Sequence, residues 1–376
     1  QYDNVLVRVD ILERLPHDVW HLIEVKASTK VKPVHLDDLA VQAYVLGGAG
    51  LTLAGMRLMH LNRNYIHPGG PLDMAQLFTL ADVTAAVVQQ VAEVPVRLHQ
   101  MKAMLIRPET PNIQPGAQCH EPYECRFWAH CTEQKPARWL FYLPGSKRNF
   151  LKLVERGIDT IDEIPAGTPL SSAQQRMKDN VEWIGPQLQQ ALKSVQYPIH
   201  HLDFETFMPA LPRYPQTRPY HTLPFQWSNH IEMDDGSVCH EAFLSSERKD
   251  PREEFALRLL ESVGSTGTIC VYSDYERGVL QNLAEVLPSL RREIQAVMSR
   301  LWDLFSIVQR HYYHPGFAGS YSIKSVLPAL APHLDYADLE IRDGELASLM
   351  YRRMMFEDVG MHDEIRIRTA LLEYCK

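Results

Sequence analysis

Two apolar segments of this chain carry charged side chains at alternate positions, and this pattern constrains the fold more than any other feature. The first is "WHLIEVKAS", with Glu24 and Lys26, and the second is "YPIHHLDFETF", with Asp203 and Glu205. Both segments are typical of β-strands, in which alternate side chains share one face. Because an unpaired charge on a buried strand is costly, each pair is expected to meet a counter-charge or to lie on a solvated edge.

The order of the expected elements divides the chain into three regions. Residues 1–139 are expected to form one domain, which starts with a strand hairpin in residues 1–30 and continues with a helix, a strand and a long helical stretch at 72–105. Residues 140–197 are expected to be a helical connector. In residues 198–376, strands come first and helices with a strand between them follow, which predicts an α/β or α+β domain.

Composition excludes some classes of protein. The formal net charge is −8, which argues against a wholly basic, non-specific nucleic-acid binder but leaves room for a local basic groove. No apolar run approaches the roughly 20 residues that span a bilayer, and no signal peptide is visible. The six cysteines do not form a secreted disulfide framework, so a reducing cytoplasm is expected. The chain starts with Gln and stops in a helical pattern, so both ends are expected to be missing.

The first candidate site is built on the hairpin and the helix that follows it. Asp10 lies near the end of the first expected strand, and Glu24 and Lys26 share one face of the second. Two carboxylates on one face can hold a hard cation such as Mg²⁺, and a lysine can stabilise charge on a phosphate. Gln42 and Tyr44 lie on the next helix, where a polar side chain could steady a water or a phosphate. The alternative is an edge-strand ion pair, worth about 0 to 1 kcal/mol.

The segments "VDI", "LIEVKAST" and "LAVQAYVL" together resemble the RecB-like PD-(D/E)XK nucleases, including the CRISPR-associated exonuclease branch. This resemblance implies a restriction-endonuclease-like core in which Asp10 and Glu24 bind Mg²⁺ or Mn²⁺. It further implies that Lys26 is the catalytic lysine and that Gln42 and Tyr44 form the helix motif.

Three cysteines lie close together in "CHEPYECRFWAHC", namely Cys119, Cys125 and Cys131. They could contribute to a [4Fe–4S] cluster, which has four cysteine ligands as a rule. They could instead bind zinc, with His120 or His130 as the fourth ligand, or they could be unligated. The RecB-like branch implies an iron–sulfur cluster, with a fourth cysteine before residue 1. The other cysteines are expected to be buried apolar residues: Cys239, Cys270 and Cys375.

The second candidate site starts from Asp203 and Glu205, which share one face of their strand. "TICVYSDYERGVL" is a second buried strand that runs into a helix with Glu276 at its start, and "LWDLFSIV" places Asp303 in an apolar helix. Acids from several elements can hold two Mg²⁺ ions about 4 Å apart, which clamp the two oxygens of a phosphodiester displacement. The alternative is a solvated strand face and an acid that favours a helix N-terminus.

"LDFET" and "VYSDYERGVL" resemble motifs of the DnaQ-like, DEDD-type exonucleases, with Glu276 where Asp is usual. Four segments, "YPIHHLDFETF", "LPFQWSNH", "PGFAGSYSIKSVLPAL" and "LLEYC", resemble more closely an uncharacterised bacterial domain family that is often fused behind a RecB-like nuclease. This resemblance covers residues 198–376. These resemblances imply an RNase H-like domain whose last metal-binding Asp lies past Lys376.

The sequence therefore predicts a metal-dependent nuclease that acts on nucleic acid, DNA rather than RNA by resemblance. A nucleic-acid-binding scaffold with one or both sites inactive is the alternative. A third hypothesis is a zinc-containing interaction module.

Overall fold

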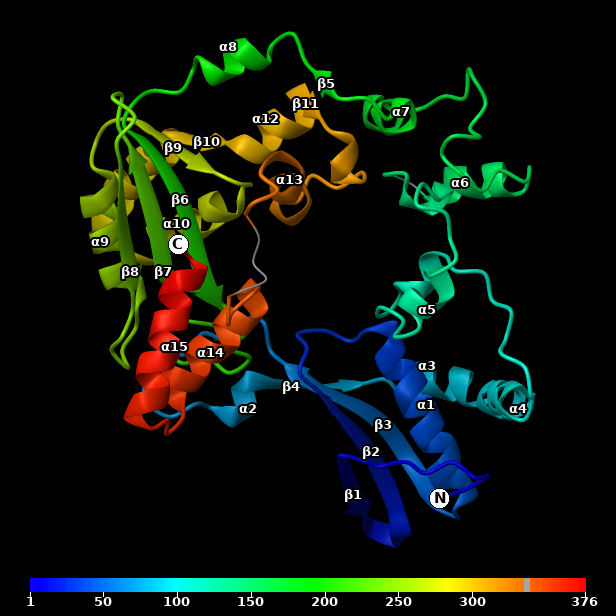
Figure 1. The fold of residues 1–376 in the computed structure, drawn as a ribbon. Helices are drawn as coiled ribbons and strands as arrows, with labels where there is room; N and C mark the ends of the chain where they lie inside the picture. The colour runs from blue at the N-terminus through cyan, green and yellow to red at the C-terminus, as the bar shows by residue number, and fades with distance from the viewer. Residues whose placement is uncertain (146, 335–338) are drawn as a thin grey trace. The chain divides into compact units, whose positions relative to one another are not determined.

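The computed structural model describes residues 1–145, 147–334 and 339–376, which form two compact units. The first unit contains residues 1–131 and 208–221, and the second contains residues 132–207 and 222–376. Each unit has a sheet covered by helices (Figure 1). The protein is thus a mixed α/β protein. No described helix is long and apolar enough to cross a membrane.

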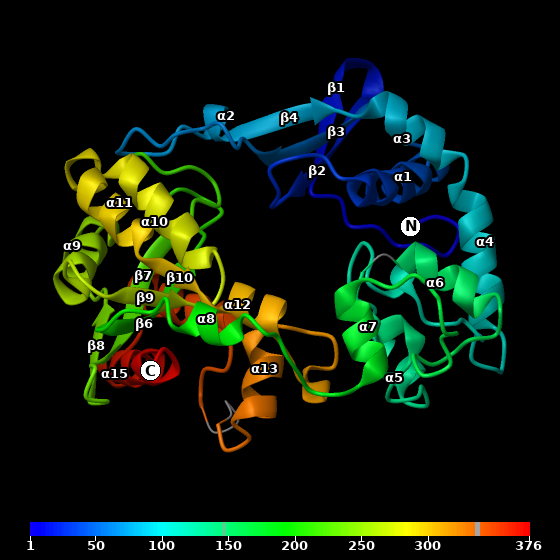
Figure 2. The same ribbon diagram turned by 90° about the horizontal axis from the view of Figure 1, so that it is seen from above.

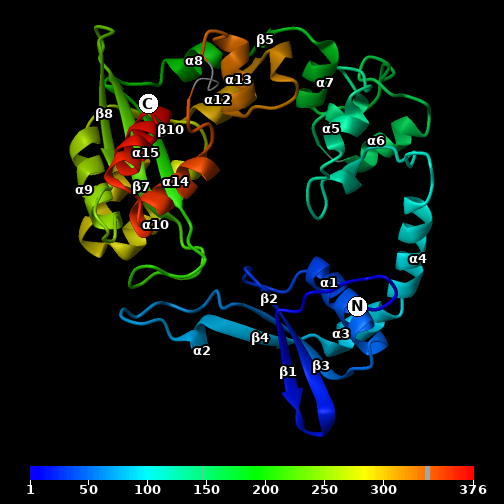
Figure 3. The ribbon, with the colours of Figure 1, turned by 60° about the horizontal axis from the view of Figure 1, so that its bottom comes forward.

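The first unit is built on a four-stranded sheet in the order β1-β2-β3-β4. Its elements are β1 (Ile11–Leu15), β2 (Val19–Lys26), α1 (Pro33–Gly48), β3 (Thr52–Leu61), α2 (Met74–Leu77), β4 (Phe78–Asp82), α3 (Thr84–Val91) and α4 (Val94–Leu105). β1 and β2 form the expected antiparallel hairpin, β2 and β3 are parallel, and β3 and β4 are antiparallel. Figure 3 shows β1, β2 and β3 side by side with α1 beside them. Leu22, Leu39, Leu58 and Val87 form the core between this sheet and α1 and α3.

Two local expectations for the first unit are wrong. The expected first strand at 4–12 is paired as a strand only from Ile11 onward. The expected long helix at 72–105 is interrupted by β4, because residues 78–82 pair with β3 over five positions. Pairing with a neighbouring strand overrides local helix propensity, which is only a weak preference.

Residues 208–221 come between β6 and β7 of the second unit in the sequence, but they belong to the first unit. The Tyr220 hydroxyl donates to the carbonyl of Ala27 at 2.7 Å, directly after Lys26. The backbone of His67 pairs with this segment, donating to Thr217 at 2.9 Å and accepting from Gln216 at 2.8 Å. The first unit is therefore completed by a segment that sequence order alone does not assign to it.

The second unit is built on a five-stranded sheet in the order β10-β9-β6-β7-β8. The strands are β6 (Ile199–Phe207), β7 (Leu223–Glu232), β8 (Val238–Leu244), β9 (Thr268–Val271) and β10 (Leu301–Asp303). β6, β7 and β8 are antiparallel neighbours, whereas β9 is parallel to β6 and to β10. The expected strands at 225–233, 239–244 and 267–273 are confirmed as β7, β8 and β9.

Helices cover both faces of this sheet, as Figure 2 shows for α10 and α11 on one side and α15 on the other. The helices that follow β8 in the second unit are α9 (Arg252–Val263), α10 (Tyr275–Val286), α11 (Arg291–Ser299), α12 (Leu304–His311), α13 (Ile323–Leu330), α14 (Gly344–Phe356) and α15 (Met361–Tyr374). The largest core lies between the sheet and α9, α10 and α11, and includes Phe204, Trp227, Phe255 and Leu280.

The expected connector at 140–197 is helical in part. It contains α6 (Lys147–Val154), α7 (Ser172–Asp179) and α8 (Leu188–Leu192). It also contains a short strand, β5 (Trp183–Ile184), which pairs with β11 (Tyr312–Tyr313) in the later part of the second unit. Leu140, Ile161, Met177 and Tyr313 share a small apolar core. The region is thus packed into the second unit by its own core and by strand pairing.

Candidate active sites

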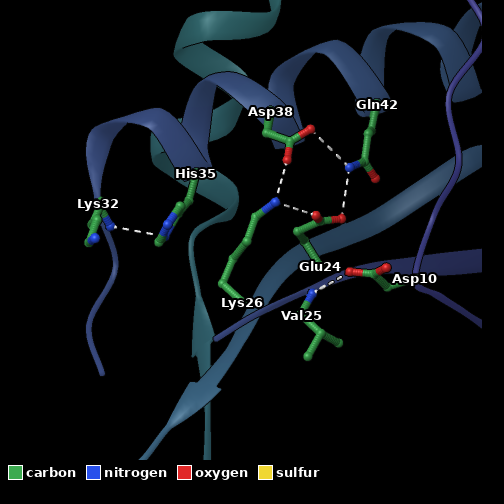
Figure 4. A network of polar contacts seen from close by, with 8 residues as sticks. All are labelled: Asp10, Glu24, Val25, Lys26, Lys32, His35, Asp38 and Gln42. Carbon is green, nitrogen blue, oxygen red and sulfur yellow. Dashed lines mark hydrogen bonds and ion pairs between the residues drawn. The ribbon is translucent and has the colours of Figure 1, made fainter. Parts of the chain in front are cut away.

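Glu24, Lys26 and Gln42 meet in the first unit, in the network of Figure 4. The Lys26 Nζ donates to Glu24 Oε1 at 2.6 Å, and the Gln42 Nε2 donates to Glu24 Oε2 at 2.7 Å. Both oxygens of the Glu24 carboxylate are thus held from two different elements, β2 and α1. The Glu24 side chain is only 7% exposed, so these bonds replace most of its hydration.

Asp38 is the member of this network that the sequence analysis missed. Its Oδ2 accepts from Lys26 Nζ at 2.5 Å, and its Oδ1 accepts from Gln42 Nε2 at 3.2 Å. Asp38 and Gln42 are four residues apart on α1, so they lie on the same helix face. That spacing is the signal in the sequence that could have identified Asp38.

The charges of this network support one another. Burial opposes the charge of Lys26, but the hydrogen bonds and charges of Asp38 and Glu24 outweigh it and raise the pKa of Lys26 to about 12. Burial likewise opposes the charge of Asp38, but the bonds from Lys26 and Gln42 lower its pKa overall. The ammonium and the Asp38 carboxylate are therefore both charged at neutral pH.

Asp10 and Tyr44 have different positions. The Asp10 Oδ2 accepts from the backbone amide of Val25 at 2.8 Å, so the hairpin places Asp10 beside the residue that follows Glu24. The Tyr44 hydroxyl instead donates to Asp3 at 3.2 Å. Because residues two apart on a helix point in nearly opposite directions, Tyr44 lies away from the face that carries Gln42.

The donor set of the first site suits a hard cation. Asp10, Glu24 and Asp38 offer carboxylate oxygens, the ligands that Mg²⁺ prefers. The Gln42 Oε1 is buried and has no hydrogen-bond partner among the described residues, so it is one more acceptor. In the geometry observed, Lys26 supplies the positive charge between Glu24 and Asp38.

The second candidate site lies on β6 and at the start of α10. Asp203 and Glu205 share one face of β6, opposite Ser228 and Gln226 of β7. Glu276 lies in the first turn of α10, is 3% exposed, and its Oε2 has no hydrogen-bond partner in the described part of the chain. Burying a carboxylate oxygen without a hydrogen-bond donor costs free energy, and binding a cation or a proton lowers that cost.

Burial and the charge of Asp203 raise the pKa of the other two carboxyl groups of this site. Burial, and then the charges of Asp203, Glu276 and Asp343, raise the pKa of Glu205 to about 8. Burial, and then the charges of Asp203 and Asp303, raise the pKa of Glu276 to about 8. Burial raises the pKa of Asp203 to about 6, although this residue keeps contact with solvent.

Asp343, Gly344 and Cys375 complete the surroundings of the acids, and none of them was singled out for this site from the sequence. Asp343 caps α14 by accepting from the amide of Leu346 at 2.8 Å. A Cβ atom at Gly344 would lie 3.3 Å from the Glu205 Oε2, so the Glu205 carboxylate rests against the N-terminus of α14. The thiol of Cys375 lies 3.8 Å from the Asp203 Oδ2.

Asp303 does not lie inside a helix as expected. It ends β10 and caps α12, because its Oδ1 accepts from the amide of Phe305 at 3.0 Å and its Oδ2 accepts from the Ser306 hydroxyl. The same Oδ1 accepts from the amide of Ser273 at 3.0 Å. Ser273 has a φ of 119°, a region that L-residues rarely adopt, and it lies just before α10. Asp303 therefore holds the turn that positions Glu276.

The cysteine segment lies between α4 and α6. The amide of Cys125 donates to the carbonyl of Cys119 at 2.7 Å, and the ring of His120 packs on Trp128 with centroids 4.4 Å apart. Cys131 is exposed, whereas Cys119 and Cys125 are half-buried. Of the other cysteines, Cys270 and Cys375 are buried as expected and Cys239 is exposed, because the outer strand β8 leaves it uncovered.

Across the described ranges, His, Cys, Asp and Glu side chains do not gather in threes around a point that could hold a metal ion. This holds for the three cysteines and for both groups of acids. In the second site, the charge of Asp203 raises the pKa of Glu205 and of Glu276, but the described acids do not form a closed coordination sphere.

Comparison with known families gives one finding. Residues 200–322 match a family described as "Domain of unknown function (DUF2779)". Comparison with the curated proteins and with the solved structures gives no match. The matched region includes the four acids that the sequence predicted for the second site, Asp203, Glu205, Glu276 and Asp303. Part of the chain, most of it in the second unit, is thus similar to a family whose function is not known.

Proposed function

We propose that this protein is a divalent-metal-dependent nuclease that hydrolyses phosphodiester bonds of nucleic acid, DNA rather than RNA. The observation that carries the proposal is the group of Asp203, Glu205 and Glu276. Three carboxyl groups from two elements are held in surroundings where burial raises the pKa of each, and repulsion from neighbouring carboxylates further raises the pKa of Glu205 and Glu276. Such an arrangement is unfavourable by itself, and strongly perturbed acids of this kind cluster at functional sites.

A bound Mg²⁺ or Mn²⁺ would relieve that repulsion, and Asp203, Glu205 and Glu276 are the residues that would hold it. When bound, a divalent ion polarises a phosphoryl oxygen and activates water as a nucleophile. The protein's own contribution is orientation. Asp303 fixes the turn before Glu276, and the N-terminus of α14 supports the Glu205 carboxylate.

The first site supports the same function. Asp10, Glu24 and Asp38 would hold a cation, and Gln42 fixes the Glu24 carboxylate by its 2.7 Å bond. Lys26 remains charged through the neutral range because its pKa is about 12. Its ammonium can therefore stabilise negative charge on a phosphate.

The finer family assignment is part of this proposal. The order of strands in the first unit is compatible with the RecB-like PD-(D/E)XK nucleases, and the order β10-β9-β6-β7-β8 is compatible with an RNase H-like domain. Cys119, Cys125 and Cys131 are proposed to contribute to an iron–sulfur cluster, with zinc as the alternative. Elemental analysis of the purified protein distinguishes the two, since a cluster contains iron and acid-labile sulfide.

The second candidate function is a nucleic-acid-binding scaffold with one or both sites inactive. One observation favours it for the first site. Lys26 forms ion pairs with both Glu24 and Asp38 and offsets part of their negative charge, so this network is held together without a metal ion. In that case the first unit would bind nucleic acid without cleaving it.

Cleavage assays test the proposal. The protein is incubated with end-labelled single- and double-stranded DNA and RNA, with Mg²⁺, with Mn²⁺ or with chelator. Lys26→Ala, Glu24→Ala, Asp203→Ala and the double variant of the two acids run beside it. Two exposed acids serve as matched controls, Glu109→Ala in the first unit and Glu293→Ala in the second.

We expect metal-dependent cleavage that one or both of the acid variants abolish and the controls retain. Loss in Glu24→Ala and Lys26→Ala assigns the chemistry to the first unit, and loss in Asp203→Ala assigns it to the second. Absence of cleavage by the wild-type protein, with binding retained, overturns the nuclease proposal in favour of the scaffold.

A further inference from the structure

Three histidines form a row across the sheet of the second unit. The strand register places His201 of β6 directly opposite His230 of β7, and His230 directly opposite His240 of β8. Residues that face each other in an antiparallel sheet point to the same side. The rings of His230 and His240 are stacked, with centroids 4.3 Å apart.

This row lies on the same face as the candidate acids and next to them. His201, Asp203 and Glu205 alternate along β6, so all three point to one side of the sheet. The row therefore lies two residues, or about 7 Å, from the row that contains Asp203 and Ser228. The His201 side chain is 47% exposed and His240 is exposed, so a ligand can reach both ends of the row.

The two outer rings are held in place by one nitrogen each. His201 Nε2 lies 3.2 Å from the Glu232 Oε2, and His240 Nε2 lies 2.9 Å from the Ser228 hydroxyl. Within the described residues, the second nitrogen of each ring makes no hydrogen bond. If the Ser228 hydroxyl donates to His240 Nε2, the neutral His240 ring presents its Nδ1–H to solvent.

Ring N–H groups beside a group of acids can bind phosphates of a nucleic-acid strand that the acids themselves would repel. The acids repel each phosphate of a nucleic-acid strand except the one that a cation brings to them. A neighbouring phosphate therefore needs donors of the protein itself. We propose that His230 and His240 of this row bind the phosphate next to the scissile one, in a strand whose scissile phosphate lies at Asp203 and Glu205. This inference rests on the proposed function.

Paired substitutions in the full chain test the row. His230→Gln and His240→Gln keep a side-chain N–H donor, whereas His230→Phe and His240→Phe keep a flat ring and lose it. His362→Phe, at an exposed histidine of α15, is the matched control. Binding of a fluorescein-labelled single-stranded DNA oligonucleotide is measured by anisotropy in chelator, so that no cleavage is needed.

We expect the double Phe variant to raise the Kd about tenfold, the double Gln variant to stay within about threefold, and the control to match the wild type. Weaker DNA binding by the double Gln variant but not by the double Phe variant overturns the assignment, because it indicates that a base stacks on the rings. Equal binding by all variants, or no binding by the wild type, also overturns it.

A second readout separates this inference from the proposed function. Thymidine 5′-(p-nitrophenyl phosphate) has one phosphodiester and no neighbouring phosphate, whereas the same reporter with an added nucleotide has both. In Mn²⁺, the double Phe variant should lower kcat/KM about tenfold for the longer reporter only. An equal loss on both reporters contradicts the row's assignment. Binding that depends on the row without any cleavage contradicts the nuclease proposal alone.

Discussion

Glu276 is a buried carboxyl group whose ionisation destabilises the folded second unit. Its pKa is raised to about 8 in the fold, mainly by burial, so the folded state holds its proton at pH values where the unfolded chain has lost it. The free energy of unfolding must therefore fall as pH rises from about 4.5 to about 8 in a metal-free buffer. Glu205 changes the free energy of unfolding with pH in the same direction, since its pKa is also raised to about 8.

Glu276→Gln should flatten this pH dependence. The amide cannot ionise, so the variant should lose less stability than the wild type between pH 5 and pH 8, by about 1 to 3 kcal/mol. Urea unfolding in chelator at both pH values measures the difference, with Glu293→Gln as the exposed control on α11. If the free energy of unfolding changed equally between the two pH values in wild type and Glu276→Gln, the ionisation of Glu276 would not destabilise the fold. Added Mn²⁺ should stabilise the wild type more than the variant at pH 8.

At the scale of elements, the turn between β9 and α10 decides where Glu276 lies. Asp303 binds the amide of Ser273 in that turn and also caps α12. Asp303→Ala should lower the free energy of unfolding by about 1 to 2 kcal/mol, whereas Asp303→Asn keeps an acceptor and should lose less. The Mn²⁺-induced rise in Tm is the second measurement. It should survive in Asp303→Asn, and its disappearance there would make Asp303 a metal ligand.

The same scale shows what a sequence can predict. Alternation along β6 and β2 correctly paired Asp203 with Glu205 and Glu24 with Lys26, because a strand has one simple period. Short strands were missed where their only support is a neighbour, as for β4 and β10. Asp343 could not be placed, because its approach to Glu205 depends on how α14 packs on β6 and not on any local pattern.

At the scale of the whole molecule, the segment 208–221 makes the first unit depend on a later part of the chain. Strand β6 ends at Phe207, and the residues that follow close the first unit through Tyr220 and Thr217 before β7 begins. A chain cut between residues 131 and 207 therefore separates the first unit from part of itself. Thr217 is fully buried there, so the segment is a structural component of that unit.

Replacing residues 208–221 by a flexible Gly-Ser linker of equal length should destabilise the first unit selectively. The Tyr220 bond to Ala27 and the packing of Tyr220 near Leu61 are lost, and amide hydrogen exchange in β2 and β3 should become faster. Tyr220→Phe should show the loss of the single bond, about 1 kcal/mol. The matched control replaces the turn 233–237 between β7 and β8 in the same way. Unchanged protection of β2 and β3 in the linker variant would mean that the first unit folds without this segment, and the site at Lys26 would then be independent of the second half of the chain.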